Sequence, residues 1–220
     1  MIRIFRTHPL DLHDVRSRIA SSLGRKDLAS CTRVSQDWYD SFTPPLYNSI
    51  TLSNRGPSME SIERNKHVIQ RLRILSCTYD NLPSASVRYN VICSIMANST
   101  LVIVDLADNA IGPNGAVALS EALKTNSTLT TLNLECNSIE DDGVIALSEA
   151  LKINSTLTTL SLHTNPIRNR GAKALSEALK TNSTLTKLNL QSTMIVFKGA
   201  VFLSDALKIN STVTIRGVRL

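Results

Sequence analysis

Apolar and polar positions repeat through the second half of this chain with a period of 28 residues. The tripeptide Asn-Ser-Thr marks the period, and it begins at Asn98, Asn126, Asn154, Asn182 and Asn210. Four columns of Leu, Val or Ile and one column of Gly keep the same register. The columns are Leu101/Leu129/Leu157/Leu185, Val104/Leu132/Leu160/Leu188, Leu106/Leu134/Leu162/Leu190, Ile111/Ile139/Ile167/Ile195 and Gly115/Gly143/Gly171/Gly199. Each period therefore predicts one copy of the same structural unit.

Within one unit the spacing of apolar residues changes from two to about 3.6. Residues 132–134 (Leu-Asn-Leu) alternate as a short strand, whereas residues 143–152 are rich in helix formers. The apolar positions of this predicted helix are Ile145, Ala146, Leu147, Ala150 and Leu151. Asp141 and Asp142 precede the helix and Lys152 ends it, which suits the helix dipole. One unit is therefore a strand, a loop and a helix.

A single strand and helix cannot cover their own leucines, so neighbouring units must stack. We expect an α/β architecture, a curved solenoid over residues 98–220 with parallel strands on the concave side and helices on the convex side. Residues 51–97 form a transitional segment with degenerate units, because Ile69-x-x-Leu72-x-Ile74 and the apolar segment Val87–Met96 keep part of the pattern. Tyr47-x-x-Ile50-x-Leu52 predicts an earlier strand. The residues from Val213 onward predict a last strand that no polar cap covers. We expect either that the chain is a fragment, or that its final coil frays or pairs with a partner.

The pattern Leu129-x-x-Leu132-x-Leu134-x-x-Asn137-x-Ile139 resembles a leucine-rich repeat. The unit length and the long helix are similar to the ribonuclease-inhibitor-like class. In that family the Asn side chain bonds backbone groups of the neighbouring coil, and the resemblance implies this role for Asn109, Asn137 and Asn165. The fourth unit has Thr193 at this position, so we expect its loop to differ.

Residues 8–50 do not share the repeat, and their apolar spacing predicts a module of three short helices. The segment resembles an F-box, the motif with which substrate receptors of cullin ubiquitin ligases dock on a Skp-type adaptor. The residues that carry the resemblance, and to which it assigns adaptor binding, are Leu12, His13, Val15, Ile19, Leu23, Leu28, Val34 and Trp38. His13 stands where the family usually has Pro, which puts adaptor affinity in question.

Side chains between the strand leucines and just after them should face the concave side, the usual ligand surface of leucine-rich repeats. They are Thr131, Asn133, Glu135, Thr159, Ser161, His163, Lys187, Asn189 and Gln191. We expect this set to supply contacts to a target protein, with Glu135, His163 and Lys187 foremost because they differ most between units.

Composition narrows the function further. The net charge of +6 is concentrated in residues 1–97, which carry +5, and it lacks interleaved aromatic residues, so nucleic-acid binding has no support. No apolar run is long enough for a membrane helix, and we expect no signal peptide.

Four scattered cysteines, Cys31, Cys77, Cys93 and Cys136, indicate reduced thiols and a cytoplasmic or nuclear protein. The Asn-Ser-Thr triplets match the glycosylation pattern, but we interpret them as turns in which Asn takes the left-handed conformation after each helix.

No motif for a catalytic, metal or cofactor site is present. We therefore expect a non-catalytic substrate receptor of a Skp/cullin/F-box ubiquitin ligase, whose N-terminal module holds the adaptor while the repeats recruit a target. The alternative is a ribonuclease-inhibitor-like scaffold or binding protein with no ligase role.

Overall fold

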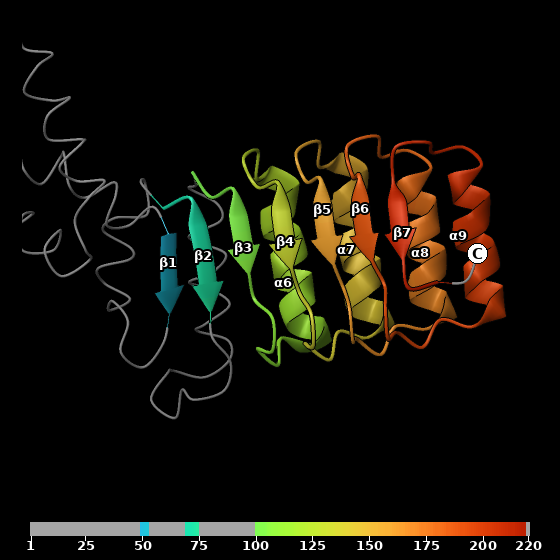
Figure 1. The fold of residues 1–220 in the computed structure, drawn as a ribbon, viewed down its shortest axis with the longest axis horizontal. Helices are drawn as coiled ribbons and strands as arrows, with labels where there is room; N and C mark the ends of the chain where they lie inside the picture. The colour runs from blue at the N-terminus through green and yellow to red at the C-terminus, as the bar shows by residue number, and fades with distance from the viewer. Residues whose placement is uncertain (1–48, 53–68, 75–99, 219–220) are drawn as a thin grey trace, which may run out of the picture.

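The structure, a computed structural model, describes residues 49–52, 69–74 and 100–218. These residues form seven strands and four helices (Figure 1). The strands are β1 (Ser49–Leu52), β2 (Arg71–Ile74), β3 (Ile103–Asp105), β4 (Thr131–Asn133), β5 (Thr159–Ser161), β6 (Lys187–Asn189) and β7 (Thr214–Arg216). The helices are α6 (Gly112–Thr125), α7 (Asp141–Ile153), α8 (Asn169–Leu179) and α9 (Phe197–Leu207). Strand and helix alternate from β3 onward, as the repeat predicts.

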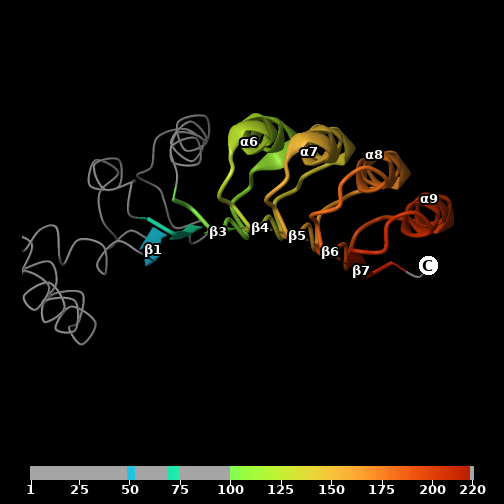
Figure 2. The ribbon, with the colours of Figure 1, turned by 90° about the horizontal axis from the view of Figure 1, so that it is seen from above.

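All seven strands lie in one parallel sheet whose order follows the sequence. Helices α6 to α9 cover one face of this sheet and follow its curve on the outside (Figure 2). The predicted solenoid, with strands on the concave side and helices on the convex side, is therefore confirmed. Strands β1 and β2 also confirm the two degenerate strands expected upstream, whereas Val87–Met96 and residues 8–50 lie outside the described residues.

The leucine columns form the core between the sheet and the helices. Leu132 pairs with Leu160 and Leu160 with Leu188 across the parallel register, and all three are at most 1% exposed. One detail of the predicted helix is wrong, because Val144 is buried while Ile145 and Ala146 are only half-buried. The stripe that faces the sheet runs through positions 144, 147 and 151, and the two half-buried residues fall beside it on the helix.

The Asn side chains after the strands bridge neighbouring coils, as the resemblance implies. Asn137 Oδ1 accepts hydrogen bonds from Asn109 N (2.9 Å) and Ile111 N (3.2 Å), and its Nδ2 donates to Leu106 O (2.8 Å). Asn165 repeats this arrangement one coil later. The side chain of Asn109 donates within its own loop, to Ala107 O at 2.7 Å.

The fourth unit departs from this arrangement, as expected from Thr193. The Thr193 hydroxyl donates to Leu190 O (2.8 Å) in its own coil. The Ile167 backbone N–H, whose counterpart in the coil before bonds an Asn side chain, donates instead to Asn165 O at 2.7 Å. Pro166 precedes Ile167, and its fixed φ excludes the left-handed conformation that Ser138 holds one coil earlier with φ 53°.

The prediction that Asn takes the left-handed conformation after each helix is wrong. Asn126 and Asn154 are extended, with φ of −73° and −69°, because the side chain rather than the backbone makes the turn. Asn154 Oδ1 accepts from Thr156 N (3.0 Å) and Leu157 N (2.8 Å). Its Nδ2 donates back to Leu123 O (2.9 Å) and Asn126 O (3.0 Å) of the preceding coil. The bonds recur at Asn182 and Asn210, so the Asn-Ser-Thr column is a second buried asparagine ladder.

Two of the helices receive their N-terminal caps from the preceding coil. The N-cap residue of α8, Arg168, makes no side-chain capping bond. Asp141 Oδ1, at the start of α7, instead accepts from Arg168 N (2.8 Å) and Gly171 N (2.9 Å). Asn169 does the same for Val196 N and Gly199 N at the start of α9. A Cβ at Gly171 would lie 2.8 Å from Asp141 Oδ1, and one at Gly199 would lie 2.6 Å from Asn169 Oδ1, so these close approaches favour glycine at both capped positions.

The exposed sides of the helices carry ion pairs three residues apart, as expected for solvated helix faces. The pairs are Glu121/Lys124, Glu149/Lys152, Glu177/Lys180 and Asp205/Lys208, with N···O distances of 2.6–2.8 Å. The hydrogen bond from Lys180 holds the pKa of Glu177 below its ordinary value. Within the described ranges no helix is both long and apolar enough to cross a membrane.

Candidate protein-binding surface

The concave face of the sheet carries the nine residues that the sequence singled out. Strand residues alternate with the buried leucines, so every second side chain points away from the core. The first row across the strands consists of Arg71, Ile103, Thr131, Thr159, Lys187 and Thr214. The second row consists of Arg73, Asp105, Asn133, Ser161, Asn189 and Arg216. The third row, just after the strands, is Glu135, His163 and Gln191.

In the second row, polar side chains bond one another across three strands. Arg73 Nε lies 3.1 Å from Asp105 Oδ2, and Asn133 Nδ2 donates to Asp105 Oδ1 at 2.9 Å. The sequence reasoning named Asn133 but missed Arg73 and Asp105. Both strands that contain these residues were predicted, so following the row from Asn133 to the two preceding units would have found them.

In the third row, His163 contacts both of the other residues. Its Nδ1 is 3.0 Å from Gln191 O, and a carbonyl only accepts, so this nitrogen carries the hydrogen. Its Nε2 lies 3.4 Å from Glu135 Oε1 and can donate to that carboxylate when the ring is protonated. Glu135 and His163, two of the three residues expected to differ most between units, are therefore each other's neighbours.

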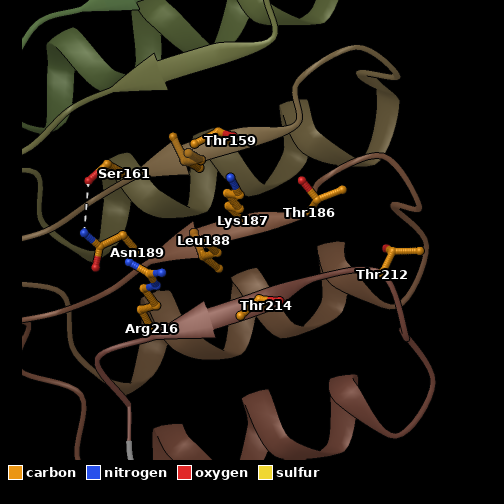
Figure 3. Close-up of a pocket in the computed structure, with 10 residues that line it drawn as sticks. Thr159, Ser161, Thr186, Lys187, Leu188, Asn189, Thr212, Thr214 and Arg216 are labelled. Atoms are coloured by element: carbon orange, nitrogen blue, oxygen red, sulfur yellow. Dashed lines mark hydrogen bonds between the residues drawn. The ribbon is translucent and has the colours of Figure 1, made fainter.

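The C-terminal half of the concave face is hollowed into a shallow depression over β5, β6 and β7, with a cavity volume of about 540 Å³ (Figure 3). It is lined by Thr159, Leu160, Ser161, Thr186, Lys187, Leu188, Asn189, Thr212, Thr214 and Arg216. The sequence reasoning missed Thr214 and Arg216 because the last unit pairs one residue out of period. Lys187 pairs with Thr214 and Asn189 with Arg216, a step of 27 residues instead of 28.

The described residues include one cysteine near this face, Cys136, which follows Glu135. Burial is the largest cause that raises the pKa of the Cys136 thiol, and a hydrogen bond with Thr164 lowers it by less. A raised pKa keeps the thiol protonated and slow to react. Among the described residues, no group of three His, Cys, Asp or Glu side chains could hold a metal ion.

The residues assigned to adaptor binding by the F-box resemblance, from Leu12 to Trp38, lie outside the described residues. Their role stays a prediction. The same holds for target contacts by the nine concave residues, although the structure brings all nine to one face.

The fold and this polar concave face define a solenoid of the leucine-rich-repeat class. Three segments, residues 97–120, 125–148 and 154–176, match the family model described as Leucine Rich repeat. The coils that contain β3, β4 and β5 are therefore leucine-rich repeats.

Solved structures of the same fold are similar to this chain. One is described as "Leiomodin-1 Actin-Binding Site 2 (ABS2)", with 23% identity, a TM-score of 0.52, and coverage of 71% of this chain and 91% of that one. Another is the tropomodulin C-terminal domain from Caenorhabditis elegans, with 13% identity, a TM-score of 0.53, and coverage of 63% and 84%. Likeness at these identities shows the fold. A search of curated proteins found no match to the chain.

Proposed function

We propose that this protein is a non-catalytic binding scaffold that holds a partner protein against the concave face of its repeats. The contrast between constant and variable columns carries this proposal. The buried Leu and Asn columns hardly change from coil to coil, whereas the third row consists of the half-buried Glu135 and His163 and the exposed Gln191. Concave side chains that differ between coils, held by a core that stays the same, are suited to recognition of one particular protein.

Site-specific photocrosslinking tests this proposal. A benzophenone amino acid is placed at Thr159 or Gln191 on the concave face, and at Glu149 or Glu177 on the helices as matched controls. In cells that express the protein, we expect the concave positions to give a discrete protein adduct and the helix positions to give none. Adducts from the helix positions alone would move the binding surface to the convex side. A lack of adducts from all four positions would overturn the proposal.

A second candidate function is favoured by the F-box pattern of residues 8–50. In this form of the proposal, the N-terminal module docks a Skp-type adaptor and the repeats present a target to a cullin ubiquitin ligase in the cytoplasm or nucleus. Holding the target near the ligase raises its effective concentration without any chemistry by this chain. The scaffold without a ligase role needs fewer assumptions, because the repeats support it directly.

Calorimetry of the full chain with a purified Skp-type adaptor separates these two forms. The ligase form predicts binding that the triple variant Leu12→Ala, Ile19→Ala and Trp38→Ala abolishes while circular dichroism stays unchanged. It also predicts tighter binding by His13→Pro, which restores the residue usual in the family. If neither the natural chain nor His13→Pro binds, the scaffold form alone stands. Monomeric actin is a defined second probe, because the similar leiomodin-1 structure is described as an actin-binding site.

A further inference from the structure

We propose that the C-terminal half of the concave face binds an extended acidic peptide segment whose carboxylates stand two residues apart. We call this surface the basic groove, formed by Thr159, Ser161, Lys187, Asn189, Thr214 and Arg216. The inference rests on the proposed function, in which the concave face is the ligand surface, and adds the chemistry of the ligand and its place.

Charge is divided unequally along the concave face. Toward β2 to β4, the acidic groups have basic neighbours, because Asp105 pairs with Arg73 and Glu135 lies against His163. Over β5 to β7, Lys187 and Arg216 are both exposed, and none of the residues that line the depression is acidic. Neither cation has an ion-pair partner among the described residues. The basic groove therefore presents two positive charges that a ligand can neutralise.

The spacing of these two cations suits an extended chain. Lys187 lies opposite Thr214 in the register, so Arg216 is one strand across and two residues along from Lys187. With strands about 4.8 Å apart and a rise of about 3.3 Å per residue, the two Cα atoms are about 8 Å apart. Alternate residues of an extended peptide are about 6.6–7 Å apart and point to the same side. Two carboxylates at alternate positions can thus meet both flexible cations together.

The floor of the basic groove offers hydrogen bonds between the charges. The hydroxyls of Thr159 and Thr214 have no side-chain partner within the part of the chain that the structure describes, so they can bond a ligand. Asn189 Nδ2 lies 3.5 Å from Ser161 Oγ, a long contact that a ligand carbonyl can replace. The hydroxyls of Thr186 and Thr212 are already used, on Thr158 O and Asn210 Oδ1.

These features favour a peptide over a nucleic acid. No aromatic side chain lines the depression, so bases have no surface on which to stack. Two cations also neutralise few phosphates, whereas specific nucleic-acid binding commonly uses about 6–10 such contacts.

Fluorescence anisotropy with the full chain tests the inference. The probe is a labelled seven-residue peptide that alternates Ser and Glu, and the comparison peptide carries the same number of Glu residues in one block. We expect the alternating peptide to bind more tightly, and binding to weaken as salt is raised. The double variant Lys187→Gln/Arg216→Gln should lose about tenfold in affinity. The control double variant Lys152→Gln/Lys208→Gln makes the same charge change on the helices and should stay within about twofold.

Three results would overturn the inference: no binding of the alternating peptide at about 1 mM, equal losses in the two double variants, or tighter binding of a labelled single-stranded oligonucleotide. The photocrosslinking result then distinguishes two failures. If Thr159 and Gln191 still give adducts, the concave face binds a partner by other chemistry and the proposed function stands. If they give none, both the ligand chemistry and the proposed surface are wrong.

Discussion

In three of the described repeats, one buried asparagine joins two coils through four hydrogen bonds; these residues are Asn154, Asn182 and Asn210. Asn154 is 5% exposed, and its amide satisfies two backbone N–H groups ahead of it and two carbonyls of the coil behind it. An apolar residue of similar size leaves all four groups buried without these partners. The same burial leaves no room for a glycan, so Asn-Ser-Thr here serves the fold instead of glycosylation.

We predict that Asn154→Ala lowers the free energy of unfolding by about 3 kcal/mol or more, since each buried backbone group left unpaired costs about 1–3 kcal/mol. The adjacent substitution Ser155→Ala removes an exposed hydroxyl and should change stability by less than about 0.5 kcal/mol. Urea denaturation followed by circular dichroism measures both. Equal effects of the two substitutions would contradict the ladder.

The neighbouring residues Asp141 and Asp142 should differ in their effect on stability. Asp141 caps the next helix, so Asp141→Ala should cost about 1–2 kcal/mol, while Asp141→Asn should cost little because Asn169 makes the same bonds one coil later. Asp142 forms an exposed pair with Arg170 at 3.0 Å, and Asp142→Ala should cost at most about 1 kcal/mol. Thermal unfolding of the three variants measures these differences in stability. A large loss of stability in Asp141→Asn would refute capping by the side-chain oxygen.

At the scale of the elements, adjacent helices approach closely where the glycine column lies. A Cβ at Gly171 would stand 2.7 Å from Ile167 Cγ2 and 2.8 Å from Asp141 Oδ1, both shorter than real Cβ contacts allow. The glycine therefore keeps α7 and α8 near enough for the capping bond to form. Phe197 occupies the capping position in the fourth unit, but its side chain is 85% exposed and has no oxygen, so the series of side-chain caps ends at α9.

We predict that Gly171→Ala destabilises the protein by about 2 kcal/mol, in the range of overpacking. The loss should not add to that of Asp141→Ala, because removing the carboxylate removes one of the atoms that the new methyl group meets. A double-mutant cycle by urea denaturation should give a coupling free energy of at least about 0.5 kcal/mol. Strict additivity would show that the methyl group does not meet the cap.

The sequence predicted the repeating elements well, because a period of two and a period of 3.6 leave separate traces in the leucine columns. Through the family resemblance, it also predicted the first asparagine ladder, in which Asn137 and Asn165 after the strands bridge neighbouring coils. The second ladder was missed, because an Asn after a helix is compatible with a local turn and its partners lie 28 and 31 residues away. The caps from Asp141 and Asn169 were missed for the same reason, and Arg216 was missed because a single deletion shifts β7.

At the scale of the whole molecule, each coil contacts only its neighbours, so stability depends on the interfaces between them. The coil of β5 has a neighbour on each side, and its Leu160 pairs with Leu132 and Leu188. The concave face follows this linear order: toward β2 to β4 the cations Arg71 and Arg73 stand beside the acidic Asp105 and Glu135, whereas the depression toward β7 has Lys187 and Arg216 and no acidic residue in its lining.

We predict that Leu160→Ala costs about 2–5 kcal/mol and lowers hydrogen-exchange protection in β4 and β6 more than in β2 or β7. Mass spectrometry of exchange across the chain measures this pattern. Uniform loss of protection along the solenoid would show that the coils unfold as one unit instead of through neighbouring interfaces.

The asparagine ladder also limits how the number of coils can change. Each of Asn154, Asn182 and Asn210 reaches back to the coil immediately before it, at separations of 28 and 31 residues. A tandem duplication of one 28-residue segment places the same partners at both new junctions, so every buried amide stays satisfied. A duplication whose length is not a multiple of 28 residues would leave one amide opposite the wrong carbonyls. Homologous recombination between repeats can therefore lengthen or shorten the binding face one whole coil at a time, without a new core having to evolve.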